Sequence, residues 1–158
     1  MDKDKEIKIS YRILKIHTTS FSIKDISEQE LEDLFRDGNA LLNMGSNINI
    51  DNSKSTVTID IKTSLTRKGE NKQLVDHTGR TAFFVENIKK FYDPKHDTYD
   101  LPTNFILQLL GISFSHSRAL LSTELQSSVY ADKFVLPVIN PNILLPKHIK
   151  EQKGKIED

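Results

Sequence analysis

The stretch TVTIDIKTSL, residues 56–65, carries the clearest structural signal in the chain. Apolar and polar side chains alternate along it, which is typical of a β-strand that buries one face and exposes the other. A turn-compatible pair, Asn52-Ser53, and a shorter alternation at residues 47–51 precede it, so two strands joined by a turn are predicted. Within the stretch, we expect Val57, Ile59, Ile61 and Leu65 in the core and Thr58, Asp60, Lys62 and Ser64 in water.

Two more strands are expected beside this pair. Residues 7–16 alternate between apolar and polar side chains, and residues 81–85 (TAFFV) are mostly apolar. A polar connection at residues 67–72, which contains Gly69, leads toward the second of these segments. Because short connections favour antiparallel neighbours, the sequence predicts a sheet of four antiparallel strands.

Helical patterns follow two start signals. Ser27 stands three residues before Glu30, which is the spacing of a capping box, and predicts a helix over residues 28–36. After Pro102, apolar residues recur every three or four positions as far as about residue 128, and Gly111 is expected to separate a short helix from a longer one. The predicted fold class is therefore α+β, with long C-terminal helices packed on one face of the sheet. We expect one domain over residues 1–158, with flexible tails at 1–6 and 147–158.

Composition narrows the classes of function. The chain has 22 Lys and Arg residues against 22 Asp and Glu, so no excess of positive charge points to nucleic acid. It has no cysteine, which excludes disulfides and thiol chemistry and favours a reducing cytoplasm. No apolar run reaches 18 residues and no signal-peptide pattern follows Met1, so we expect neither export nor membrane insertion.

Motifs for catalysis are sparse. The five histidines are scattered, no pair has metal-ligand spacing on one helical face, and the isolated Gly69 and Gly79 do not form a phosphate loop. The run SFSHS at residues 113–117 lacks the glycines of a nucleophile elbow. We therefore expect no enzyme activity, no metal and no cofactor. A small hydrolase that uses His116 stays as an alternative, and loss of esterase or nuclease activity in His116→Ala would support it.

Several strings resemble the SecB family of export chaperones, over roughly residues 7–145. Residues 11–18 (YRILKIHT) look like that family's first strand, and residues 81–85 like its fourth. The most specific likeness lies in residues 117–121 (SRALL) and 136–145 (LPVINPNILL). In the family, an arginine and a small residue in the long helix precede a proline-containing loop and an asparagine, and here these places are taken by Arg118, Ala119, Pro137 and Asn140.

The chain also departs from the family pattern. Export members usually have glycine where Ala119 stands, the helix predicted at residues 28–36 is extra, and Pro146 shortens the C-terminal helix. Export members bind the translocation ATPase SecA partly through an acidic sheet surface, whereas Lys62 stands beside Asp60 here. The chain thus looks like a divergent member.

The resemblance implies an ATP-independent holdase of the cytoplasm that binds unfolded polypeptides, such as exported preproteins, in apolar grooves. It also implies a homotetramer built as a dimer of dimers, no cofactor, and SecA as a partner. The alternative is a SecB-like interaction module that serves one partner, such as an antitoxin. The candidate peptide-binding residues, each of which is equally interpretable as core, are Phe83, Phe84, Phe105, Phe114, Tyr130 and Phe134.

Overall fold

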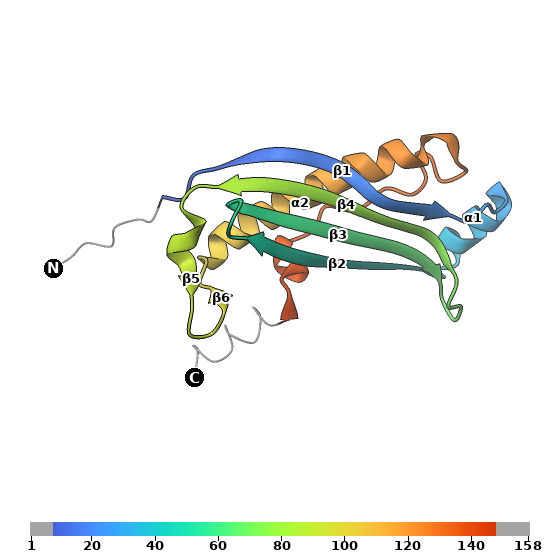
Figure 1. The fold of residues 1–158 in the computed structure, drawn as a ribbon. Helices are drawn as coiled ribbons and strands as arrows, with labels where there is room; N and C mark the ends of the chain where they lie inside the picture. The colour runs from blue at the N-terminus through green and yellow to red at the C-terminus, as the bar shows by residue number, and fades with distance from the viewer. Residues whose placement is uncertain (1–7, 148–158) are drawn as a thin grey trace.

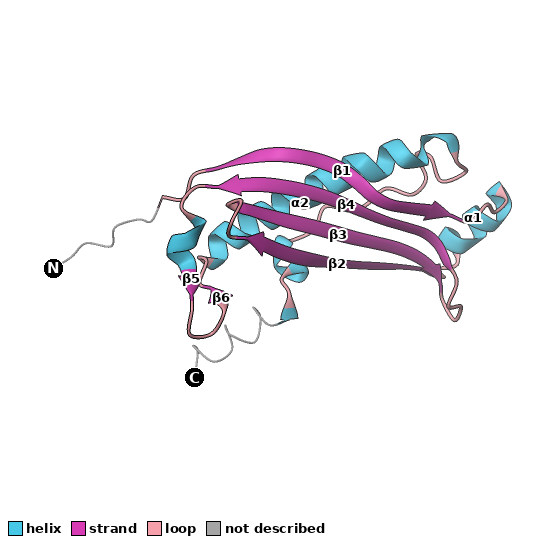
Figure 2. Ribbon diagram, viewed as in Figure 1, coloured by secondary structure: helices cyan, strands magenta, loops and turns pink. Residues whose placement is uncertain are grey.

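Four long antiparallel strands and one long helix form the framework of the protein (Figures 1 and 2). The computed structural model describes residues 8–147. The sheet has the strand order β1-β4-β3-β2, and α2 (Thr103–Glu124) packs on one of its faces. The predicted α+β fold class is confirmed. The strands are β1 (Tyr11–Ile23), β2 (Ala40–Asp51), β3 (Thr56–Arg67) and β4 (Gln73–Val85).

The alternation in β3 separates the two faces of the sheet as predicted. Val57, Ile59 and Ile61 are 0–1% exposed and lie opposite Phe83, Thr81 and Gly79 of β4. The helix α2 covers this face, because Ser117 lies against Gly79. On the other face, Asp60 of β3, which was expected in water, is only 9% exposed, because it lies opposite Arg80 of β4 and forms with it a bidentate ion pair at 2.6 and 2.8 Å. The hydrophobic core therefore lies between the sheet and α2.

A short helix, α1 (Glu28–Arg36), links β1 at one edge of the sheet to β2 at the other. The predicted capping box is present, since Ser27 Oγ accepts from the Glu30 amide and the Glu30 carboxylate accepts from the Ser27 amide. Leu31 and Leu34 are buried on one side of the helix. Local sequence thus determines where α1 starts, and two leucines attach it to the core.

Three of the strands are longer than the sequence pattern predicts. β1 extends to Ile23, β2 begins at Ala40 and β4 begins at Gln73, while the predicted start of the first strand at Ile7 lies outside the described residues. In β1 the pairing register shifts between Ile13 and Lys15 and again between Thr18 and Ser20. Each such irregularity interrupts the two-residue alternation, so the pattern fades although the strand continues.

The predicted break at Gly111 is wrong, because α2 runs through this residue without interruption. Packing against the sheet and against the 3₁₀ turn η3 (Pro141–Leu144) offsets the low helix propensity of glycine. A Cβ atom at position 111 would lie 3.4 Å from Cγ of Pro141. This is an ordinary van der Waals distance, so α2 and the C-terminal segment are neighbours at Gly111.

A small hairpin between β4 and α2 was not predicted. It follows the 3₁₀ turn η1 (Ile88–Phe91) and consists of β5 (Tyr92–Asp93) and β6 (Thr98–Tyr99). The 3₁₀ turn η2 (Leu125–Ser127) directly continues α2. Apart from Lys147, the predicted tails at 1–6 and 147–158 lie outside the described residues. Among the helices described, none combines the length and the apolar character needed to cross a membrane.

Candidate functional site

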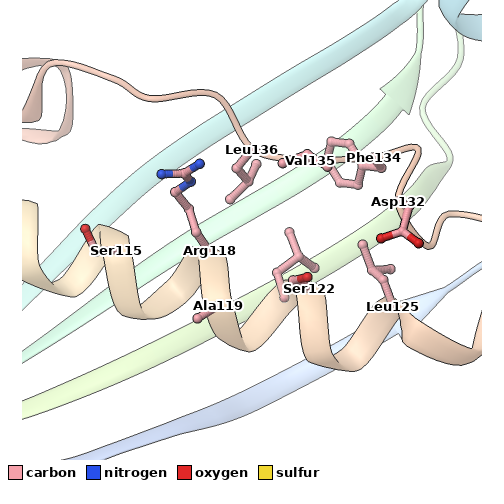
Figure 3. A pocket seen from close by; sticks show the side chains of 10 residues that line it. Ser115, Arg118, Ala119, Ser122, Leu125, Asp132, Phe134, Val135 and Leu136 are labelled. Atoms are coloured by element: carbon pink, nitrogen blue, oxygen red, sulfur yellow. The ribbon is translucent and has the colours of Figure 1, made fainter.

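A pocket with both apolar and polar lining residues lies between the C-terminal half of α2 and the segment that returns along it after η2 (Figure 3). Its volume is about 330 Å³, which is within the range of protein sites that bind small molecules or single side chains. We call it the α2 groove. Its lining residues are Ser115, Arg118, Ala119, Leu121, Ser122, Leu125, Asp132, Phe134, Val135 and Leu136.

The turn that forms one end of the α2 groove is held by Tyr130. Its ring is fully buried, and its hydroxyl donates to the carbonyl oxygen of Lys24 over 2.8 Å. The Phe134 amide donates to the Tyr130 carbonyl oxygen over 2.9 Å, and Asp132 has the left-handed backbone conformation, with φ of 59°. These contacts reverse the chain, so residues 134–136 run beside α2 (Figure 3).

Residues 134–136 alternate between core and solvent. Phe134 and Leu136 are 7% and 3% exposed, whereas Val135 between them is 67% exposed. Val138, two residues beyond Leu136, is 84% exposed. The inner wall of the groove is thus part of the core, while Val135, which also lines the groove, stands in solvent, where a bound chain would cover it.

The charges of the α2 groove lie apart from each other. Arg118 stands on α2, and its guanidinium extends toward Leu136, whereas Asp132 lies toward the other end of the groove beside Leu125 (Figure 3). Within residues 8–147 the two side chains form no ion pair with each other. The groove therefore presents a cation and an anion at separate places, with apolar side chains between them.

The structure disperses the six candidate peptide-binding residues. Phe134 lines the α2 groove, and Tyr130 anchors the turn that forms it. Phe84 lies on the other face of the sheet, where Arg12 stacks over its ring at 5.1 Å. The remaining three are buried in the core between sheet and helix: Phe83, Phe105 and Phe114.

Sequence reasoning missed an apolar patch on the edge strand β1. Ile13, Leu14 and Ile16 are 44%, 47% and 40% exposed, and no described strand pairs with the outer edge of β1. Ile16 lies opposite Thr81, whose hydroxyl forms a 3.0 Å hydrogen bond with His116 Nδ1, so the patch borders α2. The three apolar residues of RILKI were the available signal, but their exposure depends on which strand lies at the edge of the sheet.

Two histidines lie between the sheet and α2. His77 is fully buried, its Nε2 atom is 3.1 Å from Thr18 Oγ1, and its Nδ1 atom has no partner among the described residues. Burial lowers the pKa of His77, against the opposing effects of Glu124 and Asp76, and burial likewise lowers the pKa of His116. Both imidazoles are thereby favoured in the neutral form. Within residues 8–147, no three His, Asp or Glu side chains gather closely enough to hold a metal ion.

Comparison with known proteins gives matches in structure but not in sequence. No protein-family model matches this chain, and no curated protein sequence matches it. The SecB-like chaperone Rv1957 of Mycobacterium tuberculosis, solved with a peptide from the antitoxin HigA1, is similar with a TM-score of 0.49 and 11% identity, over 82% of this chain and 89% of that one. A protein of unknown function from Streptococcus agalactiae has a TM-score of 0.39 and 8% identity, over 84% and 98% of the two chains. The function must therefore be inferred from the side chains of this chain.

Proposed function

We propose that this protein is an ATP-independent holdase that binds unfolded polypeptide segments in the α2 groove. The observation that carries the proposal is the groove itself, a hollow of about 330 Å³ with an apolar inner wall and with Val135 of its lining 67% exposed. Exposed apolar side chains beside a preformed hollow are typical of a surface that binds other chains. The resemblance of residues 117–121 and 136–145 to SecB chaperones supports the same function.

The chemistry of the groove suits a passive binder. Its inner wall includes Leu121, Leu125, Phe134 and Leu136, which offer contact area and little sequence selectivity. A pocket of this size takes one or two apolar side chains, so each groove binds weakly. Useful avidity then requires long clients and several grooves in one assembly.

We propose that β1 supplies the contact for self-assembly. An open strand edge with Ile13, Leu14 and Ile16 exposed is an aggregation hazard unless another chain covers it. A second subunit pairing along β1 would satisfy the edge and bury the three side chains. A dimer of dimers in the cytoplasm, with exported preproteins among its clients, is the assembly that the family resemblance implies.

Suppression of aggregation tests the holdase function. A reduced, unfolding client is followed by light scattering, alone and with substoichiometric and stoichiometric amounts of this protein. We expect suppression by the wild type and a several-fold weaker effect from Val135→Asp, because the exposed valine is replaced by a charge without disturbing the core. Leu41→Asp is the matched control, since Leu41 is also exposed but lies on the other face of the sheet. No suppression at any ratio would refute general holdase activity.

A dedicated interaction module is the second candidate, and the sheet surface favours it. The carboxylate of Asp60 is held by Arg80, and Lys62 stands beside it, so this face lacks the acidic character expected for docking to SecA. Affinity capture from the native cytosol distinguishes the two functions. Many unrelated proteins indicate a holdase, and a single stoichiometric partner, such as an antitoxin, indicates a dedicated module.

A further inference from the structure

Arg118 is the unpaired arginine of the described chain. Arg36 pairs with Asp33, Arg80 with Asp60 and Arg67 with Glu70, and Arg12 stacks on Phe84. Arg118 makes no hydrogen bond, ion pair or ring contact within residues 8–147. Its side chain is nevertheless half-buried, on α2, in the wall of the α2 groove (Figure 3).

The Arg118 side chain as a whole is half-buried, and its guanidinium is not among the buried unpartnered groups, so it is open to water and to a ligand. Apolar groove residues, including Ala119, Leu121 and Leu136, lie near it. Its planar fork of N–H donors matches a carboxylate in two parallel hydrogen bonds.

We propose that Arg118 makes the α2 groove selective for segments in which an acidic side chain stands next to an apolar one. The apolar side chain enters the hollow beside Phe134 and Leu136, and the carboxylate binds the Arg118 guanidinium. Asp132, toward the other end of the groove, repels a second acidic residue there and so sets the direction of the bound segment. The inference rests on the proposed function, because it names the class of segment that the same groove binds.

Three fluorescent peptides of identical sequence test this, each with one phenylalanine followed by Glu, Gln or Lys. Their dissociation constants are measured by fluorescence anisotropy with the full chain at low and at moderate salt. We expect the Glu peptide to bind the wild type about fivefold more tightly than the Gln peptide, and the Lys peptide to bind most weakly. The preference for Glu should shrink as salt rises, since the ion pair is partly screened.

Three variants connect the preference to Arg118. Arg118→Gln should lose the difference between the Glu and Gln peptides while still binding the Gln peptide. Arg118→Lys should keep only part of the difference, because it retains the charge but not the planar fork. Arg12→Gln, an arginine exchanged on the opposite face of the sheet, should behave like the wild type.

Two results would overturn the inference. Equal binding of the Glu and Gln peptides by the wild type would show that Arg118 does not bind the carboxylate. A preference for the Glu peptide that remains in Arg118→Gln would show the same. If all three peptides fail to bind, the groove is not a peptide site, and the proposed function fails together with the inference. If circular dichroism shows that Arg118→Gln does not fold, two other results test the role of Arg118. They are a reduced preference for the Glu peptide in Arg118→Lys and a preference of the wild type that shrinks as salt rises, and the absence of both would overturn the inference.

Discussion

Gly79 of β4 lies directly under Ser117 of α2. A Cβ atom at position 79 would be 2.8 Å from Ser117 Oγ, which is closer than side-chain carbons approach in proteins, and 3.2 Å from Ser117 Cα, which is tighter than most such contacts. The absence of a side chain at this point lets the helix settle onto the sheet. Arg118 follows Ser117 in the helix, so the same contact also positions one wall of the α2 groove.

Replacement of Gly79 by alanine should destabilise the fold. The new methyl group would force α2 away from β4, and overpacking of this kind costs about 1–3 kcal/mol, more than the roughly 0.4–1 kcal/mol that a Gly-to-Ala exchange contributes by restricting the unfolded chain. Denaturant unfolding measures the difference. Gly45→Ala in β2 is the control, since a Cβ atom there has no neighbour within 4 Å, and it should be neutral or stabilising. Equal effects of the two exchanges would contradict the close contact.

Acid should destabilise the protein through His77. Burial lowers the pKa of His77 in the folded state, so the unfolded chain binds a proton more readily than the folded one. The contribution of the neutral imidazole is therefore complete above its unfolded pKa of about 6.5 and is lost as the pH falls below that value. His116, whose pKa burial also lowers, adds to the same trend.

Unfolding free energies measured between pH 7.5 and 5 test this titration. The slope with pH should be smaller in His77→Gln than in the wild type, whatever the absolute stability of the variant. His96→Gln is the control, because His96 is exposed and pairs with Asp93 in the β5–β6 hairpin, and it should leave the fall in stability below pH 6.5 in place. A slope unchanged in His77→Gln would assign the acid sensitivity to other groups.

Replacement of Arg80 should lower the free energy of unfolding more than replacement of Arg12. Asp60 has a side chain only 12% exposed, and both of its oxygens bind Arg80. In Arg80→Met the carboxylate stays behind without its partner, and we expect a loss of about 1–2 kcal/mol in thermal or denaturant unfolding. Arg12→Met removes only a stacking contact with Phe84 and should cost about 0.5 kcal/mol. Adding Asp60→Asn to Arg80→Met should restore part of the loss, and no recovery would mean that the charge was not the cause.

The hydroxyl of Tyr130 should contribute to the stability of the fold. Tyr130→Phe tests this contribution, because it removes the hydroxyl and keeps the ring. This substitution removes a 2.8 Å hydrogen bond to the Lys24 carbonyl and should lower stability by about 1 kcal/mol. It should also loosen the turn that forms the end of the α2 groove, and so weaken peptide binding. Tyr11→Phe is the matched control, because the Tyr11 hydroxyl accepts its hydrogen bond from the exposed Gln108. Hydrogen exchange at the Phe134 amide, faster only in Tyr130→Phe, would verify the local effect.

Local signals were enough to predict much of the framework. The alternation of Val57, Ile59 and Ile61 identified both β3 and the side of the sheet that is buried, and the Ser27–Glu30 capping box located the start of α1. Such signals involve neighbours in the chain, so they can be seen in the sequence. The break expected at Gly111 failed because the packing of α2 on the sheet and on η3 is a contact between distant segments.

By itself, the sequence determined the order of the four long strands and of α1 and α2, and the buried face of β3. Only the tertiary structure decided which apolar side chains stay accessible. Phe83 and Val135 are both apolar, yet one is fully buried and the other is 67% exposed. The difference arises because burial depends on which segments fold over each other. The α2 groove exists for the same reason, since residues 132–136 return along α2 after the turn held by Tyr130 and Lys24.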